Sequence, residues 1–173
     1  MNLFIRTEDY FRFLENFDEA LSADVTEIKT DRIGVSPVYP LGEIHLHDGS
    51  TVQIHFMHYV NFYQARQKWI ERSKRIDKNN LFVLMELGIE TTPEYVERFD
   101  RLPFKNKVVI TNAPFPKLHS IIFIDIFGPD YKQGTLVRLI PHSFHRHIEL
   151  FDYRHWLNTS QIRHAKFYKK FIQ

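Results

Sequence analysis

Apolar residues recur along the chain with two different periods, and these periods predict helices and strands. Apolar side chains three or four positions apart predict helices after Thr7, across residues 62–76 and after Thr92-Pro93, a pair that suits an N-cap and a first helical turn. Short apolar runs predict strands instead. The predicted strands cover residues 2–5, 81–85, 108–111, 120–127 and 135–140, and a helical turn covers residues 152–157.

The clearest local motif is a β-hairpin over residues 43–59. A three-residue loop at 48–50 would place Ile44 opposite Ile54, whereas a two-residue loop would place Ile44 opposite Gln53. Facing positions on one surface of a hairpin pack against each other, so matching apolar residues stabilise it. We therefore expect the register with the three-residue loop.

The order of these elements predicts the fold class. Strands and helices alternate between residues 52 and 111, which predicts βαβ crossovers and a parallel stretch of sheet. The stretch 34–42, marked by Pro and Gly, is expected to be an ordered loop inside the domain. The expected fold is α/β with three layers, a mixed sheet with βαβ crossovers and a flanking hairpin, as a Rossmann-like variant. We expect one domain over residues 1–159 and a basic, helical C-terminal tail over residues 160–173.

Composition narrows the class of protein. The 173 residues are 43% hydrophobic and include sixteen Phe, eight Tyr and two Trp, enough for a sizeable core. Cysteine is absent, which excludes disulfides, thiolate zinc sites, iron–sulfur clusters and cysteine nucleophiles. No apolar run approaches the ~20 residues that span a bilayer, and the N-terminus lacks the pattern of a signal peptide. We therefore expect a cytoplasmic protein.

The net charge of +2 is unevenly distributed. The tail 160–173 carries four Lys or Arg residues and no acid, so residues 1–159 carry a net charge of −2. A near-neutral domain with a basic tail differs from the broad basic face of a nucleic-acid binder, so nucleic acid is not the expected partner. The tail is expected to dock as a helix through Ile162, Phe167 and Phe171, and contact with a membrane surface through the tail stays open.

The familiar catalytic signatures are missing. The sequence has no Gly-rich phosphate loop, dinucleotide fingerprint, nucleophile elbow or zincin helix, so we expect no cofactor. Two His-x-His pairs, His45 with His47 and His145 with His147, could hold a metal if the fold supplied a third ligand such as Glu149. Exposed strand histidines are the favoured interpretation, and no metal site is predicted.

A second group of polar residues lies where the predicted strands end. His58 and Tyr59 follow the second strand of the hairpin, Glu86 follows the next strand, and Thr111 and Asn112 end the one after that. Ligands collect at the carboxyl ends of strands in open α/β sheets. We therefore predict an acid/base site with His58, Tyr59 and Glu86 as catalytic residues and Thr111 and Asn112 as substrate-binding residues. In the alternative interpretation His58 is a hydrogen-bonded core histidine and Tyr59 is a packing aromatic.

Arg72 is unusual for its place on the predicted helix 62–76. A helical wheel puts it only about 40° from the centre of the apolar stripe, where a cation needs a carboxylate or a ligand anion. It lies about 15 Å along the helix axis from the start of the helix. We therefore expect Arg72 near the edge opposite His58, in a structural salt bridge.

Several motifs occur in an order and spacing that resemble a known family. They are NLFI at 2–5, EDY at 8–10, YPLG at 39–42, IHFMHY at 54–59, NLF at 80–82, LPFKNK at 102–107, FDY at 151–153 and WLN at 156–158. This pattern resembles an uncharacterised bacterial family known as exopolysaccharide or capsular polysaccharide biosynthesis proteins. The resemblance covers roughly residues 2–158.

The resemblance implies a three-layer α/β domain that helps to build a cell-surface polysaccharide. It implies a transferase that moves a glycosyl or acyl group to a sugar intermediate, with a sugar or sugar nucleotide as substrate. Members of the family usually begin with an earlier strand and an Asn-Asn-Cys type of turn, whereas this chain starts after that point. The alternative is a non-catalytic interaction subunit of a polysaccharide synthesis complex, an N-terminally truncated, inactive relative.

Overall fold

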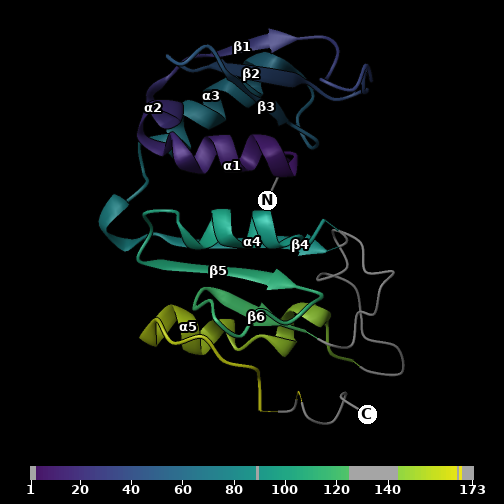
Figure 1. Cartoon of the computed structure of the whole chain (residues 1–173). Helices are drawn as coiled ribbons and strands as arrows, with labels where there is room; N and C mark the ends of the chain where they lie inside the picture. The colour runs from purple at the N-terminus through teal and green to yellow at the C-terminus, as the bar shows by residue number, and fades with distance from the viewer. Residues whose placement is uncertain (1–2, 89, 125–143, 167, 169–173) are drawn as a thin grey trace. The chain divides into compact units, whose positions relative to one another are not determined.

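The protein is an α/β protein with two compact units. The computed structural model describes residues 3–88, 90–124, 144–166 and 168. The first unit comprises residues 1–79 and the second comprises residues 80–173. The described strands form two three-stranded sheets, one antiparallel and one parallel (Figure 1), where the sequence predicted a single mixed sheet. That the two units together form the single domain predicted over residues 1–159 stays a prediction.

The first unit consists of an antiparallel sheet and three helices. Its elements are α1 (Thr7–Glu15), α2 (Phe17–Ser22), β1 (Val25–Ile28), β2 (Leu41–His45), β3 (Thr51–His55) and α3 (Phe62–Ser73). The helices after Thr7 and across 62–76 are confirmed, and Asn61 caps α3 by accepting a hydrogen bond from the Gln64 amide at 3.0 Å. Strand β1 was not predicted, because it has only four residues and only one of them is buried. The predicted strand 2–5 is reduced, in its described part, to one antiparallel bridge between Phe4 and His55.

The hairpin is confirmed, but its predicted register is wrong by two residues. Ile44 lies opposite Val52, so the apolar faces still match. The loop has three residues, 47–49, and the Leu46 amide donates to the Ser50 carbonyl at 2.9 Å to close it. Gly49 has φ +81°, the left-handed conformation that the last residue of such a loop requires. That requirement, rather than the facing apolar pairs, decides the register.

Gly42 allows the elements of the first unit to approach closely. A Cβ atom at this position would lie 2.5 Å from Val25 Cγ1 and 2.8 Å from Phe56 Cε2. It would also lie 3.3 Å from Cε2 of Phe62, the first residue of α3. Val25 and Phe56 are both buried in the core of the unit. Only glycine therefore fits here, and it brings α3 against β2.

The second unit is built on a parallel sheet. Its elements are β4 (Phe82–Gly88), α4 (Pro93–Asp100), β5 (Asn106–Thr111), β6 (Ile121–Phe123) and α5 (Tyr153–Thr159), with a 3-10 turn η4 (His147–Leu150) before α5. The 3-10 turn η1 (Lys78–Asn80) ends the first unit and leads into the second. The β4–α4–β5 crossover is parallel, as predicted, and Thr92 Oγ1 caps α4 by accepting a hydrogen bond from the Tyr95 amide.

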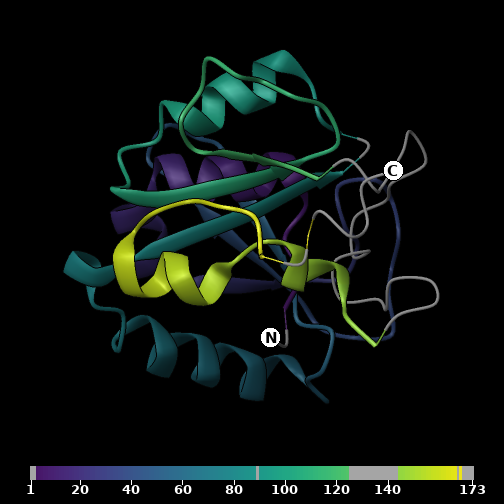
Figure 2. The same cartoon turned by 90° about the horizontal axis from the view of Figure 1, so that it is seen from below.

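The predicted crossover from β3 to β4 is wrong, because these strands belong to different sheets. Figure 2 shows α4 on one face of the parallel sheet and α5 on the other. The predicted strand 135–140 lies outside the described residues.

Residues 161–165, directly after α5, are extended, and the helix predicted for the tail over residues 160–173 stays a prediction. Ser160 has φ +62° and ends α5, and the following residues pair at His164 with Phe151 in an antiparallel bridge. Asp152 accepts hydrogen bonds from the Arg163 guanidinium at 2.8 and 3.0 Å, and Ile162 packs against the core cluster of the unit. This core cluster consists of Val108, Ile110, Ile122, Ile124, Leu150, Phe151, Trp156 and Tyr168. The predicted docking residues Phe167 and Phe171 lie outside the described residues.

The described helices carry no membrane span. None of them combines the length and the apolar composition that crossing a bilayer needs.

We expect Gly42→Ala to destabilise the protein. The new methyl group would overlap Val25 and Phe56, and overpacking of this kind costs about 1–3 kcal/mol. Urea unfolding at neutral pH measures the change. The control is His45→Ala, an exposed position on the same strand that should change stability by less than about 0.5 kcal/mol. Equal stability of Gly42→Ala and the wild type would contradict the close packing described here.

Candidate functional site

His58 and Tyr59 lie in a turn that follows β3. The Tyr59 amide donates to the Phe56 carbonyl at 3.1 Å, and the Tyr59 ring packs edge-on against Phe56. His58 is exposed and makes no hydrogen bond or ion pair with any described residue, so it is not a core histidine. Among the described strands, β3 pairs within an antiparallel sheet, so the strand-end rule for parallel sheets does not apply to these two residues.

Glu86, Thr111 and Asn112 belong to the second unit. The carboxyl ends of β4 and β5 lie side by side, as predicted, with Glu86 opposite Ile110 and Gly88 opposite Thr111. Thr111 is fully buried, and its hydroxyl donates to the Ala113 carbonyl at 2.8 Å. Asn112 follows it and is half-buried. Since His58 and Tyr59 lie in the first unit, a common site for all five residues stays a prediction.

The two His-x-His pairs each hold an ion pair with a glutamate. His45 Nε2 lies 3.7 Å from Glu43 Oε2, and His47 Nδ1 lies 2.6 Å from Glu19 Oε1. In the second unit, His145 Nδ1 lies 2.8 Å from Glu149 Oε2. Across the described residues, no group of three or more possible metal ligands comes together.

The sequence analysis missed one buried histidine, His55. It is 2% exposed, its Nδ1 lies 3.3 Å from the Tyr39 hydroxyl, and its Nε2 has no hydrogen-bond partner. Burial lowers the pKa of His55, and the positive charge of Arg6 lowers it further, while Asp31 and Asp9 act in the opposite direction. The imidazole is therefore neutral at pH 7. His55 faces Leu41 in the sheet and Phe4 packs against its ring, so its role is structural.

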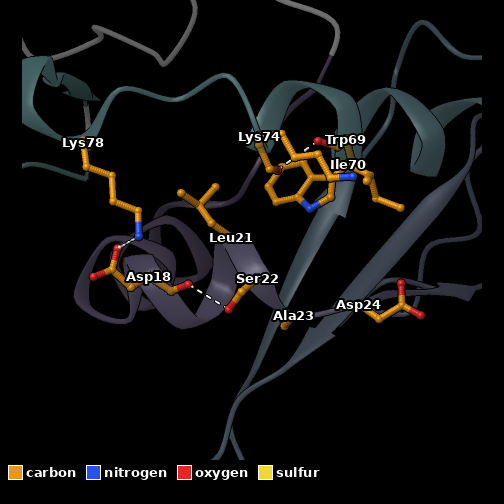
Figure 3. Close-up of a pocket in the computed structure, with 10 residues that line it drawn as sticks. Asp18, Leu21, Ser22, Ala23, Asp24, Trp69, Ile70, Lys74 and Lys78 are labelled. Atoms are coloured by element: carbon orange, nitrogen blue, oxygen red, sulfur yellow. Dashed lines mark hydrogen bonds and ion pairs between the residues drawn. The ribbon is translucent and has the colours of Figure 1, made fainter.

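Two hollows in the first unit meet at the side chain of Trp69 on α3. A groove of about 450 Å³ lies on one side (Figure 3), and an apolar pocket of about 190 Å³ lies on the other. Both are lined by Leu21, Trp69 and Ser73. Trp69 packs edge-on against Phe13 of α1, with ring centroids 5.9 Å apart, which fixes the indole between the helices.

Both acidic and basic side chains line the groove. Its remaining lining residues are Asp18, Ser22, Ala23, Asp24, Ile70, Lys74 and Lys78. Asp18 pairs with Lys78 at 2.5 Å through one oxygen. Ser22 Oγ donates to the Asp18 carbonyl at 3.0 Å (Figure 3), and Asp24 pairs with Arg66 at 2.6 Å. Carboxylates, lysines and a hydroxyl in one groove suit a ligand that both donates and accepts hydrogen bonds.

The indole N–H of Trp69 is the unusual group of this site. Trp69 is 9% exposed, and its Nε1 is buried without a hydrogen-bond partner. Figure 3 shows the ring nitrogen on the side of the groove where Ser22 and Ala23 lie. A buried donor without an acceptor costs about 1–3 kcal/mol, and such groups mark places where a ligand or water supplies the acceptor. The helical wheel predicts burial of Trp69, but no sequence signal predicts that its N–H stays unpaired.

The apolar pocket brings together side chains of α1, α2, α3 and the turn after β3. Its lining residues besides the shared three are Leu3, Phe13, Phe17, Phe56, Tyr59, Arg72 and Ile76. Arg72 was expected at the edge opposite His58, but it lines the same pocket as Tyr59. The pocket is therefore lined by Tyr59 before α3, by Arg72 on α3 and by Ile76 beyond its end. The predicted salt bridge of Arg72 is not formed with any described residue.

Comparison with known proteins defines the class of the chain. Residues 1–158 match the model of a family described as a domain of unknown function, DUF1919. The chain belongs to this family. A protein of Haemophilus influenzae, described as an uncharacterized protein, is 32% identical over 158 residues, which cover 91% of this chain and 72% of the relative.

We expect His55 to make the protein less stable as the pH falls below neutral. The folded pKa lies below the ordinary value of about 6.5, so in mildly acidic solution the unfolded chain takes up a proton that the fold excludes. Urea unfolding between pH 7.5 and pH 5 measures this loss. His55→Phe should reduce the pH dependence. The same pH dependence in His55→Phe would show that His55 titrates alike in both states.

Proposed function

We propose that the protein binds a sugar intermediate of cell-surface polysaccharide synthesis and acts as a transferase on it. The group transferred to the sugar hydroxyl is glycosyl or acyl. The resemblance to capsular and exopolysaccharide biosynthesis proteins supports the polysaccharide role. A three-layer, Rossmann-like arrangement of the chain belongs to the same proposal.

The unpaired indole N–H of Trp69 carries the proposal. A sugar hydroxyl or ring oxygen can accept this hydrogen bond, which removes the free-energy penalty of the unpaired buried donor. The second carboxylate oxygen of Asp18 and the ammonium group of Lys74 line the same groove and can bind further hydroxyls. A sugar presents donors and acceptors at such short intervals, whereas an apolar ligand could bond with none of these groups.

His58 is the proposed general base. Its imidazole is exposed, and no described residue competes for its ring nitrogens. It would take the proton of the acceptor hydroxyl as the oxygen attacks the donor, and the proton would then pass to the leaving group. Tyr59 would orient the acceptor. The catalytic role of Glu86 and the substrate-binding roles of Thr111 and Asn112, which belong to the second unit, stay sequence predictions.

We expect the indole proton of Trp69 to respond when a sugar binds. The chain has two tryptophans, so a nitrogen–proton NMR spectrum shows two indole signals, and Trp69→Phe assigns them. Addition of UDP-glucose or N-acetylglucosamine should shift the Trp69 signal downfield because the N–H gains an acceptor. Trp156, buried in the second unit, is the internal control and should not move.

Loss of the N–H should also weaken binding. A hydrogen bond of this kind contributes about 1 kcal/mol, so Trp69→Phe should raise the dissociation constant about fivefold. A Trp69 signal that stays unchanged at saturating amounts of both sugar compounds would contradict sugar binding in the groove.

We expect His58→Ala to abolish formation of the surface polysaccharide without unfolding the protein. Removal of a general base lowers a reaction rate by about 10²- to 10⁴-fold, while loss of an exposed, unpaired side chain leaves Tm nearly unchanged. Polysaccharide yield in the producing bacterium and the Tm of the purified protein measure the two effects. His45→Ala, another exposed histidine of the same unit, should retain normal yield. Normal yield in His58→Ala would exclude the imidazole as the base.

One observation favours a non-catalytic interaction subunit as the second candidate. Three large apolar side chains beside His58 are exposed: Met57 by 46%, Val60 by 87% and Tyr63 by 68%. Exposed apolar residues this close in sequence are typical of a protein contact. A stoichiometric partner recovered from polysaccharide-producing cells, together with no turnover of sugar nucleotides, would favour this function over the transferase.

A further inference from the structure

We propose that the apolar pocket beside Trp69 binds an alkyl or acyl chain of about six carbons that carries an anionic headgroup. The chain would lie among the phenylalanines of the pocket and the headgroup would lie at Arg72. The pocket adjoins the groove in which the sugar is proposed to bind and shares Leu21, Trp69 and Ser73 with it, but binding of this ligand does not depend on the transferase reaction.

The lining of the pocket selects an apolar occupant. Phe13, Phe17 and Phe56 come from three segments of the first unit and meet there, with ring centroids of Phe13 and Phe17 5.5 Å apart. Phe13 and Phe56 are 7% and 1% exposed, so this wall is part of the core rather than a loose surface patch. Apolar walls of this kind bind hydrocarbon and offer few partners to water.

The volume of the pocket sets the size of the occupant. At about 190 Å³ it is somewhat larger than an engineered apolar cavity of about 150 Å³, which stays dry and holds one benzene molecule. A chain of about six carbons therefore fills it, and longer chains would extend beyond the walls. Each methylene that enters the pocket should tighten binding about fourfold, and further methylenes should add little.

Arg72 selects an anionic headgroup. It lines the pocket, yet it forms no hydrogen bond or ion pair through its side chain with the described residues. Its sequence neighbour Glu71 is engaged elsewhere, with one carboxylate oxygen 2.7 Å from Lys68 Nζ and the other 3.7 Å from Arg75. A carboxylate or phosphate on the ligand would pair with the Arg72 guanidinium, which binds such groups with two parallel hydrogen bonds.

Titration with straight-chain carboxylates and the matching alcohols tests both parts of the site. Isothermal calorimetry would follow butanoate, hexanoate, octanoate and decanoate, all below micelle-forming concentrations. We expect the dissociation constant to fall about fourfold per methylene up to about six carbons and then to level off. Hexanoate should bind up to about fivefold tighter than hexanol, since an exposed ion pair adds only a modest gain.

Two variants separate the headgroup from the chain. Arg72→Gln should remove the preference for hexanoate over hexanol and leave hexanol binding unchanged. Arg75→Gln is the matched control, because this arginine lies three positions along and does not line the pocket, and it should keep the preference. Ile76→Trp should fill the pocket and abolish binding of both compounds.

The outcomes distinguish this proposal from the proposed function. Affinity independent of chain length, equal binding of hexanoate and hexanol to the wild type, or equal effects of Arg72→Gln and Arg75→Gln would each overturn the amphiphile site. Hexanoate binding that follows the expected pattern, with no response of the Trp69 indole proton to sugars, would sustain this site and reject the sugar groove. The reverse result would reject only this site.

Discussion

The side chain of Trp69 is the constraint on which the candidate site depends. Its indole fills the space between the groove and the apolar pocket, and its edge-on contact with Phe13 holds it there. Burial of the ring is favourable, but burial of the unpaired N–H opposes it by about 1–3 kcal/mol. A phenylalanine would fill most of the same space without this cost. A ligand in the groove that accepts this hydrogen bond would remove the cost.

The position of Trp69 follows in turn from the packing around Gly42. Because Gly42 has no side chain, the first residue of α3, Phe62, lies directly against β2. Trp69 comes seven residues later, two turns along the same helix, so it lies on the same face as Phe62. Close contact between strand and helix therefore places the indole against α1, and the two hollows form on either side of it.

Local patterns in the sequence predict most of the helices and strands, but they do not predict which strands pair with each other. The Thr92-Pro93 cap and the β4–α4–β5 crossover are confirmed because both depend on residues near in sequence. The separation of the described strands into two sheets depends on contacts between distant residues, which periodicity does not encode. For this reason the strand-end rule was extended to His58, although β3 pairs in an antiparallel sheet. His55 was missed because its burial comes from Phe4 and Tyr39, both at least sixteen positions away.

Arg72 shows what sequence reasoning can establish about a site and where it stops. The helical wheel identified a cation near an apolar stripe, and elementary electrostatics required an anion beside it. The sequence favoured a salt bridge with a carboxylate of the chain itself. Instead the Arg72 side chain is exposed to water and acts only electrostatically on Glu71, whose oxygens contact Lys68 and Arg75. A pattern can thus show that a charge lacks a local partner, whereas only the fold shows whether the chain provides one. Arg72 and Trp69 both line the apolar pocket, and a bound ligand would supply the guanidinium and the indole N–H with partners that the described residues do not.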